Sequence, residues 1–265
     1  MRVAMVQFAS STDRDGNRAT VDALLGDLAR DSYDLVVLPE GSMCDFGPPS
    51  MDLREQAEPL DGPFVTLLAA HARRLGATIV AGMFEATNSL PFNTLVALSP
   101  AGELIATYRK IHLYDSFGYR ESERLSPGEI KPVVIPVAGL SVGLMTCYDL
   151  RFPELARKLV SAGAEAIVMP SAWVKGSLKI EQWQTLVKAR AIENTLAMVA
   201  VDQCGKAYIG HSLAVDARGS ILGEAGDEAE IVTVVLDGAD IATVREENPS
   251  LRNRRMVHEK REGPV

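Results

Sequence analysis

Four residues with reactive or polar side chains share one feature of position. Each lies at or just past the C-terminal end of an apolar segment or of a predicted hairpin strand: Glu40, Lys110, Cys147 and Ser171. α/β proteins gather their functional sites at such strand ends. We therefore expect these side chains to meet in one site.

Cys147 carries the clearest chemical signal. It lies in the segment LMTCYDLRFPE at 144–154, which predicts a strand, a turn and the start of a helix. A helix N-terminus favours the thiolate form of a cysteine, and a turn exposes it. Cys147 is therefore a candidate nucleophile, and the alternative is a small buried apolar residue.

Glu40 and Lys110 supply the two groups that a cysteine nucleophile needs. A free thiol is only a few per cent ionised at neutral pH, so it requires a base to take its proton and a cation to favour the anion. Glu40 is the candidate base and Lys110 the candidate cation. The alternatives are a solvated carboxylate at a strand end and a surface lysine at a hairpin end.

The elements that must position these residues alternate between strands and helices. Apolar runs predict strands at 2–8, 34–40, 77–83, 94–98, 103–108, 133–135, 140–145, 166–169 and 197–201. Helical spacing, Pro at first turns and Gly at ends predict helices at 17–30, 63–75, 153–162 and 180–194. A closing strand pair is predicted from 211–223 and 230–236, and a polar, basic tail from about 245.

This order of elements predicts the fold class. No linker rich in Gly, Ser or Pro divides the chain, so residues 1–265 are expected to form a single domain. Hairpins mixed with β-α units predict a mixed sheet covered by helices, which is a layered α/β sandwich.

Composition excludes several classes of partner and location. The 265 residues contain 27 basic and 35 acidic side chains, for a net charge of −8. With no polybasic tract, we expect no nucleic-acid partner and no anionic membrane surface. No apolar run is long enough to span a bilayer and no signal pattern opens the chain, so a cytoplasmic protein is expected.

The other cysteines and the histidines give no ligand pattern. Cys44, Cys147 and Cys204 are an odd number at wide spacing, which predicts neither a disulfide framework nor a zinc site. Each is treated as a free thiol, and Cys204 is interpreted as structural. The phosphate-binding glycine motifs are also missing, so no metal and no cofactor are expected.

Three segments resemble, in order, the signature segments of the nitrilase superfamily of carbon-nitrogen hydrolases. They are LPE at 38–40, YRKIHL at 108–113 and CYDLRFPE at 147–154. Further matches at 121–122, 170–172, 189–194 and 210–212 extend the likeness through nearly the whole chain. The resemblance implies an α-β-β-α sandwich that dimerises so that two sheets stack. The tail from about 245 is then a candidate for contacts between subunits.

The same resemblance implies a catalytic triad and its roles. Glu40 would be the general base, Cys147 would attack the amide carbon, and Lys110 with the backbone N–H of Tyr148 would stabilise the oxyanion. Glu121 matches a second glutamate that orients the lysine; the alternative is one of several acids in an exposed loop. Such an enzyme forms a thioester, releases ammonia and needs no cofactor.

The segment CYDLRFPE resembles the amidase branch that includes omega-amidase and deaminated glutathione amidase. N-carbamoyl-amine hydrolases usually have Trp after the cysteine, and nitrilases carry Cys-Trp-Glu. We therefore expect an amidase for a small linear amide, with those two activities as alternatives. A catalytically silent scaffold subunit is the alternative from another class, and the presence of all three triad residues disfavours it. The expected assembly is a homodimer or a higher homo-oligomer.

Four further residues are predicted to contact the substrate. Arg151 is a candidate clamp for a substrate carboxylate and Trp173 a candidate aromatic wall, while Ser171 and Ala172 belong to a matching segment. The alternatives are a salt bridge at a helix start and a packing tryptophan. Omega-amidases commonly have Phe where Trp173 stands, which leaves the size of the substrate open.

Overall fold

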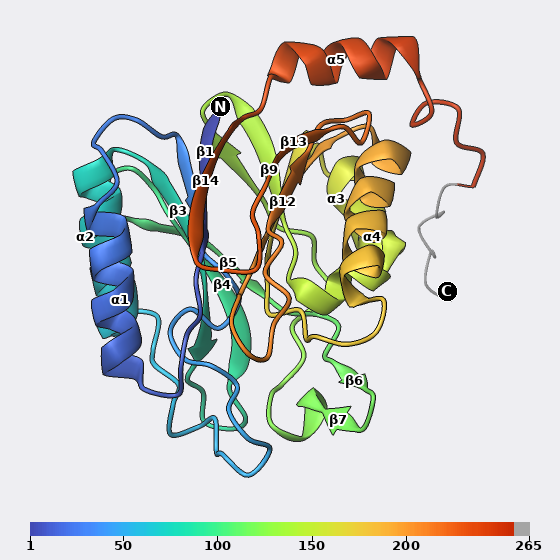
Figure 1. Ribbon diagram of the computed structural model, residues 1–265. Coiled ribbons are helices and arrows are strands. Elements are labelled where there is room, and N and C mark those ends of the chain that lie inside the picture. Colours follow the sequence, from blue (N-terminus) through green and yellow to red (C-terminus); the bar gives the residue numbers. More distant parts are fainter. Residues whose placement is uncertain (257–265) are drawn as a thin grey trace, which may run out of the picture.

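The computed structural model describes residues 1–256 and contains two six-stranded sheets (Figure 1). The strand order of the first sheet is β14-β1-β2-β3-β4-β5. Its strands are β14 (Glu230–Val235), β1 (Arg2–Gln7), β2 (Leu35–Val37), β3 (Thr78–Glu85), β4 (Phe92–Leu98) and β5 (Leu104–Arg109). The strand order of the second sheet is β13-β12-β11-β10-β9-β8. Its strands are β13 (Ile221–Glu224), β12 (Leu213–Val215), β11 (Ala197–Asp202), β10 (Ala166–Ser171), β9 (Leu140–Leu144) and β8 (Val134–Val137).

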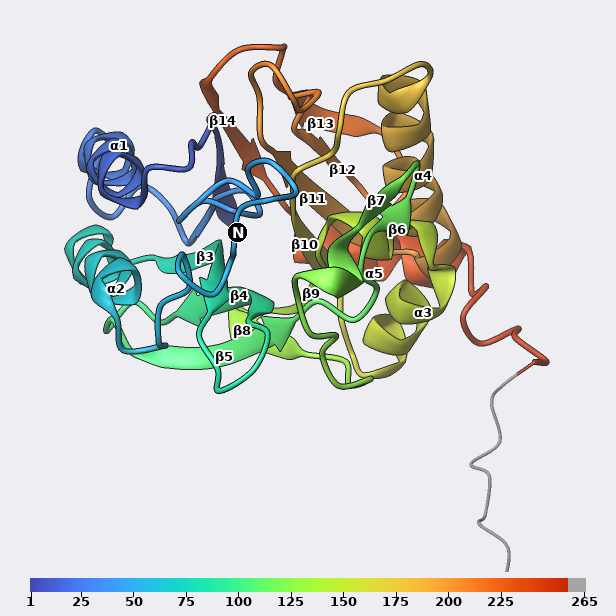
Figure 2. The ribbon, with the colours of Figure 1, turned by 90° about the horizontal axis from the view of Figure 1, so that it is seen from below.

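Helices cover the outer face of each sheet (Figure 2). The first sheet carries α1 (Arg14–Gly26) and α2 (Pro63–Leu75), and the second carries α3 (Pro153–Ser161) and α4 (Lys179–Asn194). Pro occupies the first turn of α2 and of α3, where its missing N–H costs no helical hydrogen bond. The layers therefore follow the order helix, sheet, sheet, helix, which confirms the expected α-β-β-α sandwich.

Strand β1 shows why its sequence has no polar alternation. Val3 and Met5 pack into the core between the two sheets, whereas Ala4 and Val6 pack against the helices α1 and α2. Successive side chains of a strand point to opposite faces, and here both faces are covered. An apolar run of this kind belongs to a central strand of a layered fold.

Strand direction brings the candidate residues to corresponding sheet ends. β2 runs parallel to β1 and β3, and β5 has the same direction as β3 because both pair antiparallel with β4. Glu40 and Lys110 follow β2 and β5. In the second sheet β9 and β10 are parallel, and Cys147 follows the first while Ser171 ends the second. The C-terminal strand ends therefore place all four residues on one side of the sandwich.

The structure corrects three expectations about topology. A single chain supplies both sheets, so their stacking does not require a dimer. The segments 211–223 and 230–236 do not form one closing pair: β12 and β13 form the hairpin around residues 216–219, and β14 crosses to pair with β1 in the other sheet. The helix predicted at 17–30 begins earlier, at Arg14, because the Asp13 side chain accepts from the Asp15 backbone N–H as an N-cap. It ends at Gly26.

The sequence pattern did not predict several short elements and the last helix. The hairpin of β6 (Asp115–Ser116) and β7 (Tyr119–Arg120) leads into the 3-10 helix η1 (Glu121–Glu123). The chain after β14 forms α5 (Gly238–Glu247) instead of only a polar tail. Arg245 in α5 donates to the carbonyls of Thr195 and Ala164, at 2.9 and 2.8 Å, which ties the start of the tail to its own chain. Residues 257–265 of that predicted tail lie outside the described residues.

Within residues 1–256, none of the helices has both the length and the apolar character needed to cross a membrane.

Candidate active site

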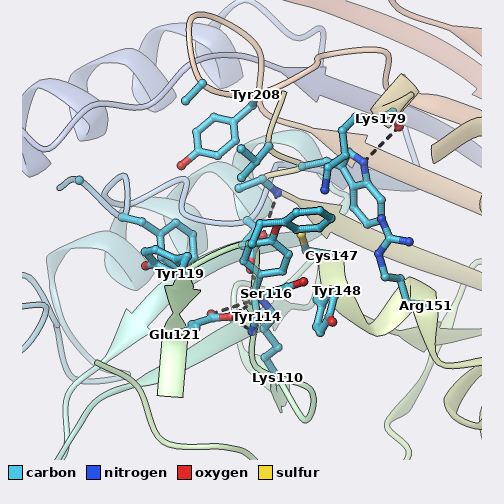
Figure 3. Close-up of a pocket in the computed structure, with 18 residues that line it drawn as sticks. Lys110, Tyr114, Ser116, Tyr119, Glu121, Cys147, Tyr148, Arg151, Lys179 and Tyr208 are labelled. Atoms are coloured by element: carbon cyan, nitrogen blue, oxygen red, sulfur yellow. Dashed lines mark hydrogen bonds and ion pairs between the residues drawn. The ribbon is translucent and has the colours of Figure 1, made fainter. Parts of the chain in front are cut away.

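The C-terminal strand ends of both sheets surround a cavity of about 270 Å³ (Figure 3). Glu40 and Lys110 line it from the first sheet, and Cys147 and Ala172 line it from the second. Glu121 reaches the same cavity from η1, beyond the β6–β7 hairpin. The four expected catalytic side chains thus line one cavity.

Cys147 lies on a strained turn. It is the first residue of the 3-10 helix η2 (Cys147–Arg151), and its φ of 43° falls in the left-handed region that non-glycine residues avoid. Reciprocal contacts hold this turn: the Asp149 carboxylate accepts from the Thr146 backbone N–H, and the Thr146 carbonyl accepts from the Asp149 backbone N–H. Strain that persists in a well-braced turn is typical of functional positions.

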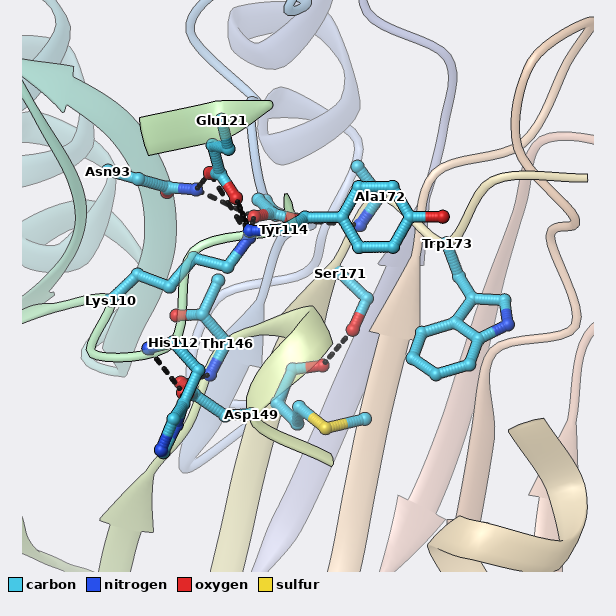
Figure 4. A network of polar contacts seen from close by, with 12 residues as sticks. Asn93, Lys110, His112, Tyr114, Glu121, Thr146, Asp149, Ser171, Ala172 and Trp173 are labelled. Carbon is cyan, nitrogen blue, oxygen red and sulfur yellow. Dashed lines mark hydrogen bonds and ion pairs between the residues drawn. The ribbon is translucent and has the colours of Figure 1, made fainter. Parts of the chain in front are cut away.

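Asp149 is the main brace of the cysteine turn. It is fully buried and accepts from the Tyr108 hydroxyl at 2.5 Å. It also accepts from the backbone N–H of Thr146 at 3.0 Å and from that of His112 at 3.2 Å (Figure 4). The His112 ring nitrogen Nδ1 lies 2.7 Å from the same carboxylate, and the ring stacks on Phe152. His112 therefore supports the Asp149 carboxylate and, through it, the cysteine turn.

Glu40 is fixed by both sheets. Its carboxylate oxygen Oε2 accepts from the backbone N–H of Ala172 at 2.8 Å, and its backbone carbonyl accepts from Gln203 Nε2 at 2.8 Å. Gly82 in β3 permits this position, because a Cβ there would lie 2.7 Å from the Glu40 Cα. The carboxylate is thereby held at the seam between the sheets.

Lys110 is buried between two carboxylates (Figure 4). Its Nζ donates to Glu40 Oε1 at 2.9 Å and to Glu121 Oε2 at 2.9 Å. Glu121 also accepts from the backbone N–H of Tyr114, at 2.5 Å. Two glutamates therefore orient one ammonium group inside the cavity.

Asn93 belongs to this network, although no sequence pattern selected it. Its Nδ2 donates to Glu40 Oε1 at 2.6 Å and to Glu121 Oε1 at 3.2 Å. A simple count back from the turn between β4 and β5 would not select it, because the register shifts by one residue between Ala97 and Leu98. This irregularity places Asn93 beside Lys110, whose backbone N–H donates to the Asn93 carbonyl. Asn93 joins the two carboxylates that flank the lysine.

Burial and charge shift the pKa values of this cluster in linked directions. Burial raises the pKa of Glu40; Lys110 opposes that rise and Glu121 adds to it. Burial alone would lower the pKa of Lys110, but the carboxylates of Glu121 and Glu40 raise it well above its ordinary value. The lysine is therefore cationic, and Glu40 titrates as part of a coupled group.

The state of the Cys147 thiol differs from the sequence expectation. The turn buries the side chain to 7% exposure instead of exposing it, and burial together with Glu40 raises the pKa of the thiol well above its ordinary value, against the opposing effect of Lys110. Desolvation outweighs the helix terminus here. The thiol therefore depends on a base to remove its proton. The free thiols Cys44 and Cys204 are buried outside this cavity.

The predicted substrate residues divide into two groups. Tyr148, Arg151, Ala172 and Trp173 line the cavity. Ser171 does not: its hydroxyl donates to the carbonyl of Met169 at 3.3 Å, away from the cavity. The first N–H groups of a helix have no partner within that helix, so the Tyr148 N–H at the second position of η2 is suited to an oxyanion.

Other cavity residues were missed because they come from irregular segments. Tyr114 and Phe117 lie around the β6–β7 hairpin, Lys179 begins α4, and Tyr208 precedes β12. Only the fold of these loops over the strand ends brings them together, and no periodic pattern encodes that fold. Within residues 1–256, no three His, Cys, Asp or Glu side chains are grouped as a metal site.

Comparison with known proteins agrees with this geometry. The carbon-nitrogen hydrolase family matches residues 2–246. A protein of Escherichia coli O157:H7 named deaminated glutathione amidase is 38% identical over 259 residues, which are 97% of this chain and 98% of that protein. The chain is thus similar to an amidase along nearly its whole length.

Two solved structures resemble the fold closely. A CN-hydrolase superfamily protein of Xanthomonas campestris, with an arsenic adduct in its active site, has a TM-score of 0.87 and 31% identity, covering 98% of this chain and 99% of that one. A mutant amidase from Nesterenkonia sp. AN1, with the acetamide moiety of fluoroacetamide added at its active-site cysteine, has a TM-score of 0.82 and 26% identity, covering 96% and 94%. This chain therefore belongs to the carbon-nitrogen hydrolase family and is a hydrolase of carbon–nitrogen bonds other than peptide bonds.

Proposed function

We propose that the protein is a cysteine-dependent amidase that converts a small linear amide into a carboxylate and ammonia through a thioester. One observation carries the proposal: a buried lysine held by two glutamates shares a cavity with a cysteine on a strained turn. That arrangement supplies a nucleophile, a base and a cation without a metal or cofactor.

In the first half-reaction Glu40 removes the proton of the Cys147 thiol, and the sulfur attacks the amide carbon. The carbonyl oxygen becomes an oxyanion, which the Lys110 ammonium and the Tyr148 backbone N–H stabilise. The C–N bond then breaks, and Glu40 returns its proton to the leaving nitrogen, so that ammonia departs. Cys147 remains acylated as a thioester.

In the second half-reaction water replaces ammonia. Glu40 takes a proton from the water while the water oxygen attacks the thioester carbon. The Lys110 ammonium and the Tyr148 backbone N–H again stabilise the oxyanion that forms. The C–S bond breaks, the proton returns to the sulfur, and the carboxylic acid leaves. Glu121 acts through Lys110, which it orients by two hydrogen bonds.

The proposed substrate class is a linear ω-amide. Support comes from the segment CYDLRFPE, from relatives named deaminated glutathione amidase, and from the position of Arg151 and Trp173 on the cavity wall. Hydrolysis of an N-carbamoyl amine or a nitrile is the alternative, and Tyr148-Asp149 after the cysteine disfavours both.

The test is ammonia release from a panel of candidates, measured with coupled glutamate dehydrogenase. The panel holds α-ketoglutaramate, deaminated glutathione, glutaramate, an aliphatic amide and an N-carbamoyl amine, with the Cys147→Ala protein as the blank. We expect preferred release from one ω-amide and a loss of at least about a thousandfold in the variant. If the panel is silent and iodoacetamide does not label Cys147, the protein is a scaffold and the proposal is wrong.

A further inference from the structure

Lys179 is a cavity residue to which the proposed mechanism gives no task. It is the first residue of α4, and Leu178 before it has a left-handed φ of 60° that turns the chain at this point. The Lys179 carbonyl accepts from Trp173 Nε1 at 3.2 Å, so the start of α4 is joined to the cavity wall. The residue is 9% exposed and lines the same cavity as Cys147.

Three aromatic rings surround the Lys179 ammonium group. Its Nζ lies 4.5 Å from the ring centroid of Phe117, 5.6 Å from that of Trp173 and 5.7 Å from that of Tyr114. Among residues 1–256, no carboxylate lies within the 4.0 Å of an ion pair with this nitrogen. Ring faces compensate a desolvated cation only in part, so the site retains an uncompensated positive charge.

A second cation lies against the same tryptophan. The Arg151 guanidinium is 4.9 Å from the centroid of the Trp173 ring, and its Nη2 donates to Gln182 Oε1 at 2.8 Å. In the described chain Arg151 also has no carboxylate partner at ion-pair distance. Burial and the charge of Arg151 both lower the pKa of Lys179, which reports the repulsion between the two cations.

The charges divide the cavity into two ends. In the view of Figure 3, Lys179 and Arg151 lie on the right, and Lys110 and Glu121 lie to the lower left. At the catalytic end Lys110 is neutralised by Glu40 and Glu121, whereas the other end carries two cations without counter-ions. A substrate with a neutral amide would fit the catalytic end of the cavity, and an anionic group at its other end would fit the two cations.

We propose that Lys179 is a specificity-determining residue that binds, together with Arg151, a carboxylate at the far end of the amide substrate. The inference rests on the proposed function and narrows its substrate to ω-amides of carboxylic acids. A carboxylate between the cations gives each of them a counter-ion and removes their repulsion. Arg151 offers a planar fork and Lys179 a point charge, so the two contact different lone pairs of one anion.

The test compares two five-carbon amides that differ at one end. Glutaramate carries a terminal carboxylate, and valeramide has a methyl group in its place. We expect Lys179→Met to lower the ratio of kcat/KM for glutaramate to kcat/KM for valeramide by about tenfold, the effect of one charge-assisted hydrogen bond. Any loss that is common to both amides cancels in this ratio.

Two matched variants separate recognition from a structural role. Lys179→Arg keeps the charge and is expected to hold the ratio within about threefold of the wild type. Phe117→Ala removes one of the three aromatic rings around the Lys179 ammonium group but keeps the cation. It is also expected to hold the ratio of the two kcat/KM values within about threefold of the wild type. If Lys179→Met lowers both kcat/KM values equally, the lysine only supports the hairpin through its aromatic contacts and the inference is overturned.

A binding measurement keeps the inference separate from the proposed function. Isothermal calorimetry with glutarate, the dicarboxylate product, requires no turnover. We expect Lys179→Met to weaken glutarate binding by about tenfold, even if neither amide is hydrolysed and the proposed function fails. Equal glutarate binding by wild type and variant, or none by the wild type at millimolar concentration, overturns the role of Lys179.

Discussion

Lys110 donates hydrogen bonds to two glutamates, and this arrangement determines how the activity of the candidate site depends on pH. Glu40 works as a base only in its ionised form, so activity requires a pH above the pKa at which it loses its proton. Burial raises that pKa, Lys110 lowers it and Glu121 raises it again. The two glutamates are therefore not equivalent: one acts on the substrate, and the other sets the charge around it.

Glu121→Gln tests this division of roles. The change removes a negative charge that raises the pKa of Glu40, and it leaves Lys110 paired with Glu40 alone. Both effects lower the pKa of Glu40. We expect the acid limb of kcat/KM for a neutral amide to move to lower pH. Initial rates of ammonia release between pH 4 and pH 9 measure the limb.

Glu123→Gln is the matched control for that experiment. Glu123 lies in the same 3-10 helix, but its side chain is 65% exposed and pairs with Arg120 at the surface. Its neutralisation is expected to leave the acid limb in place, because solvent screens surface charges. An acid limb that moves to higher pH in Glu121→Gln, or that moves equally in both variants, contradicts the assignment.

Site residues that lie next to a regular strand could be predicted from the sequence, and those that only the tertiary fold brings to the cavity could not. Glu40, Lys110 and Cys147 follow the C-terminal ends of strands, so their types and positions were visible in the sequence. Asn93 lies within a strand and required the hairpin register. Lys179 begins α4, and only the tertiary fold places this helix start over the strand ends, so the local sequence does not predict that contact.

Among the elements, the turn η2 depends on one buried carboxylate. Asp149 accepts four hydrogen bonds from β5, from the chain that follows it and from the turn itself. Asp149→Asn replaces an acceptor oxygen by an NH₂ group that faces these donors. We expect the free energy of unfolding to fall by about 2–4 kcal/mol and kcat to fall more than KM changes. Urea denaturation and steady-state kinetics measure the two effects.

Tyr108→Phe provides the graded comparison for the same network. It removes one of the four donors and is expected to lower the free energy of unfolding by about 1 kcal/mol. Equal losses in both variants would mean that Asp149 matters only through Tyr108, and the brace around Cys147 would have to be assigned to other contacts.

The contact between β3 and the Glu40 loop depends on the absence of a side chain. A Cβ on Gly82 would lie 2.7 Å from the Glu40 Cα and 2.9 Å from the Gly41 backbone nitrogen, and backbone atoms cannot move aside as side chains do. Gly82→Ala is expected to displace Glu40, reduce kcat/KM by at least about tenfold and lower the free energy of unfolding by about 1–3 kcal/mol.

Gly26→Ala is the control for this loss, because a Cβ on Gly26 at the end of α1 meets nothing within 4 Å. Its activity is expected to match the wild type, and its stability to be equal or higher by up to about 1 kcal/mol. Ammonia release and urea denaturation of both variants measure the difference. Full activity of Gly82→Ala would show that the Glu40 loop tolerates a shift.

Most elements of the fold were predictable, because a short, wholly apolar run is typical of a strand that is covered on both faces. Central strands such as β1 and β11 are apolar on both faces, and α2 has Pro63 at its start and Gly76 at its end. The pairing of β14 was not predictable, since a short amphipathic strand fits either sheet edge. Long-range contacts decide that choice, and the local pattern does not.

For the whole molecule, the stacking of the sheets is what completes the site. Glu40 and Lys110 come from the first sheet, while Cys147 and the backbone N–H of Ala172 come from the second. Each sheet alone therefore holds only some of the catalytic groups, although each group is visible in its own sequence segment. The groups meet only when the two sheets pack face to face and bury the central core.

One face of this sandwich is left with exposed apolar side chains. The Gln184 side chain of α4 donates to Glu224 of β13, and the Ile192 side chain packs against Gly219 in the turn before that strand. These two neighbouring elements carry four large apolar side chains that are at least 39% exposed: Ile180, Ile192, Ile221 and Leu222. Exposed apolar side chains gathered on neighbouring elements are candidates for a protein interface.

We propose that this face is buried in a homodimer, the assembly that the family resemblance implies. Light scattering of the full chain at micromolar concentration is expected to give about twice the monomer mass of 28.6 kDa. Ile192→Glu places a charge in the interface and is expected to weaken the dimer by at least about tenfold. Val235→Glu is the control, since Val235 is 62% exposed on β14 in the other sheet. A wild-type monomer, or equal dissociation of both variants, contradicts this interface.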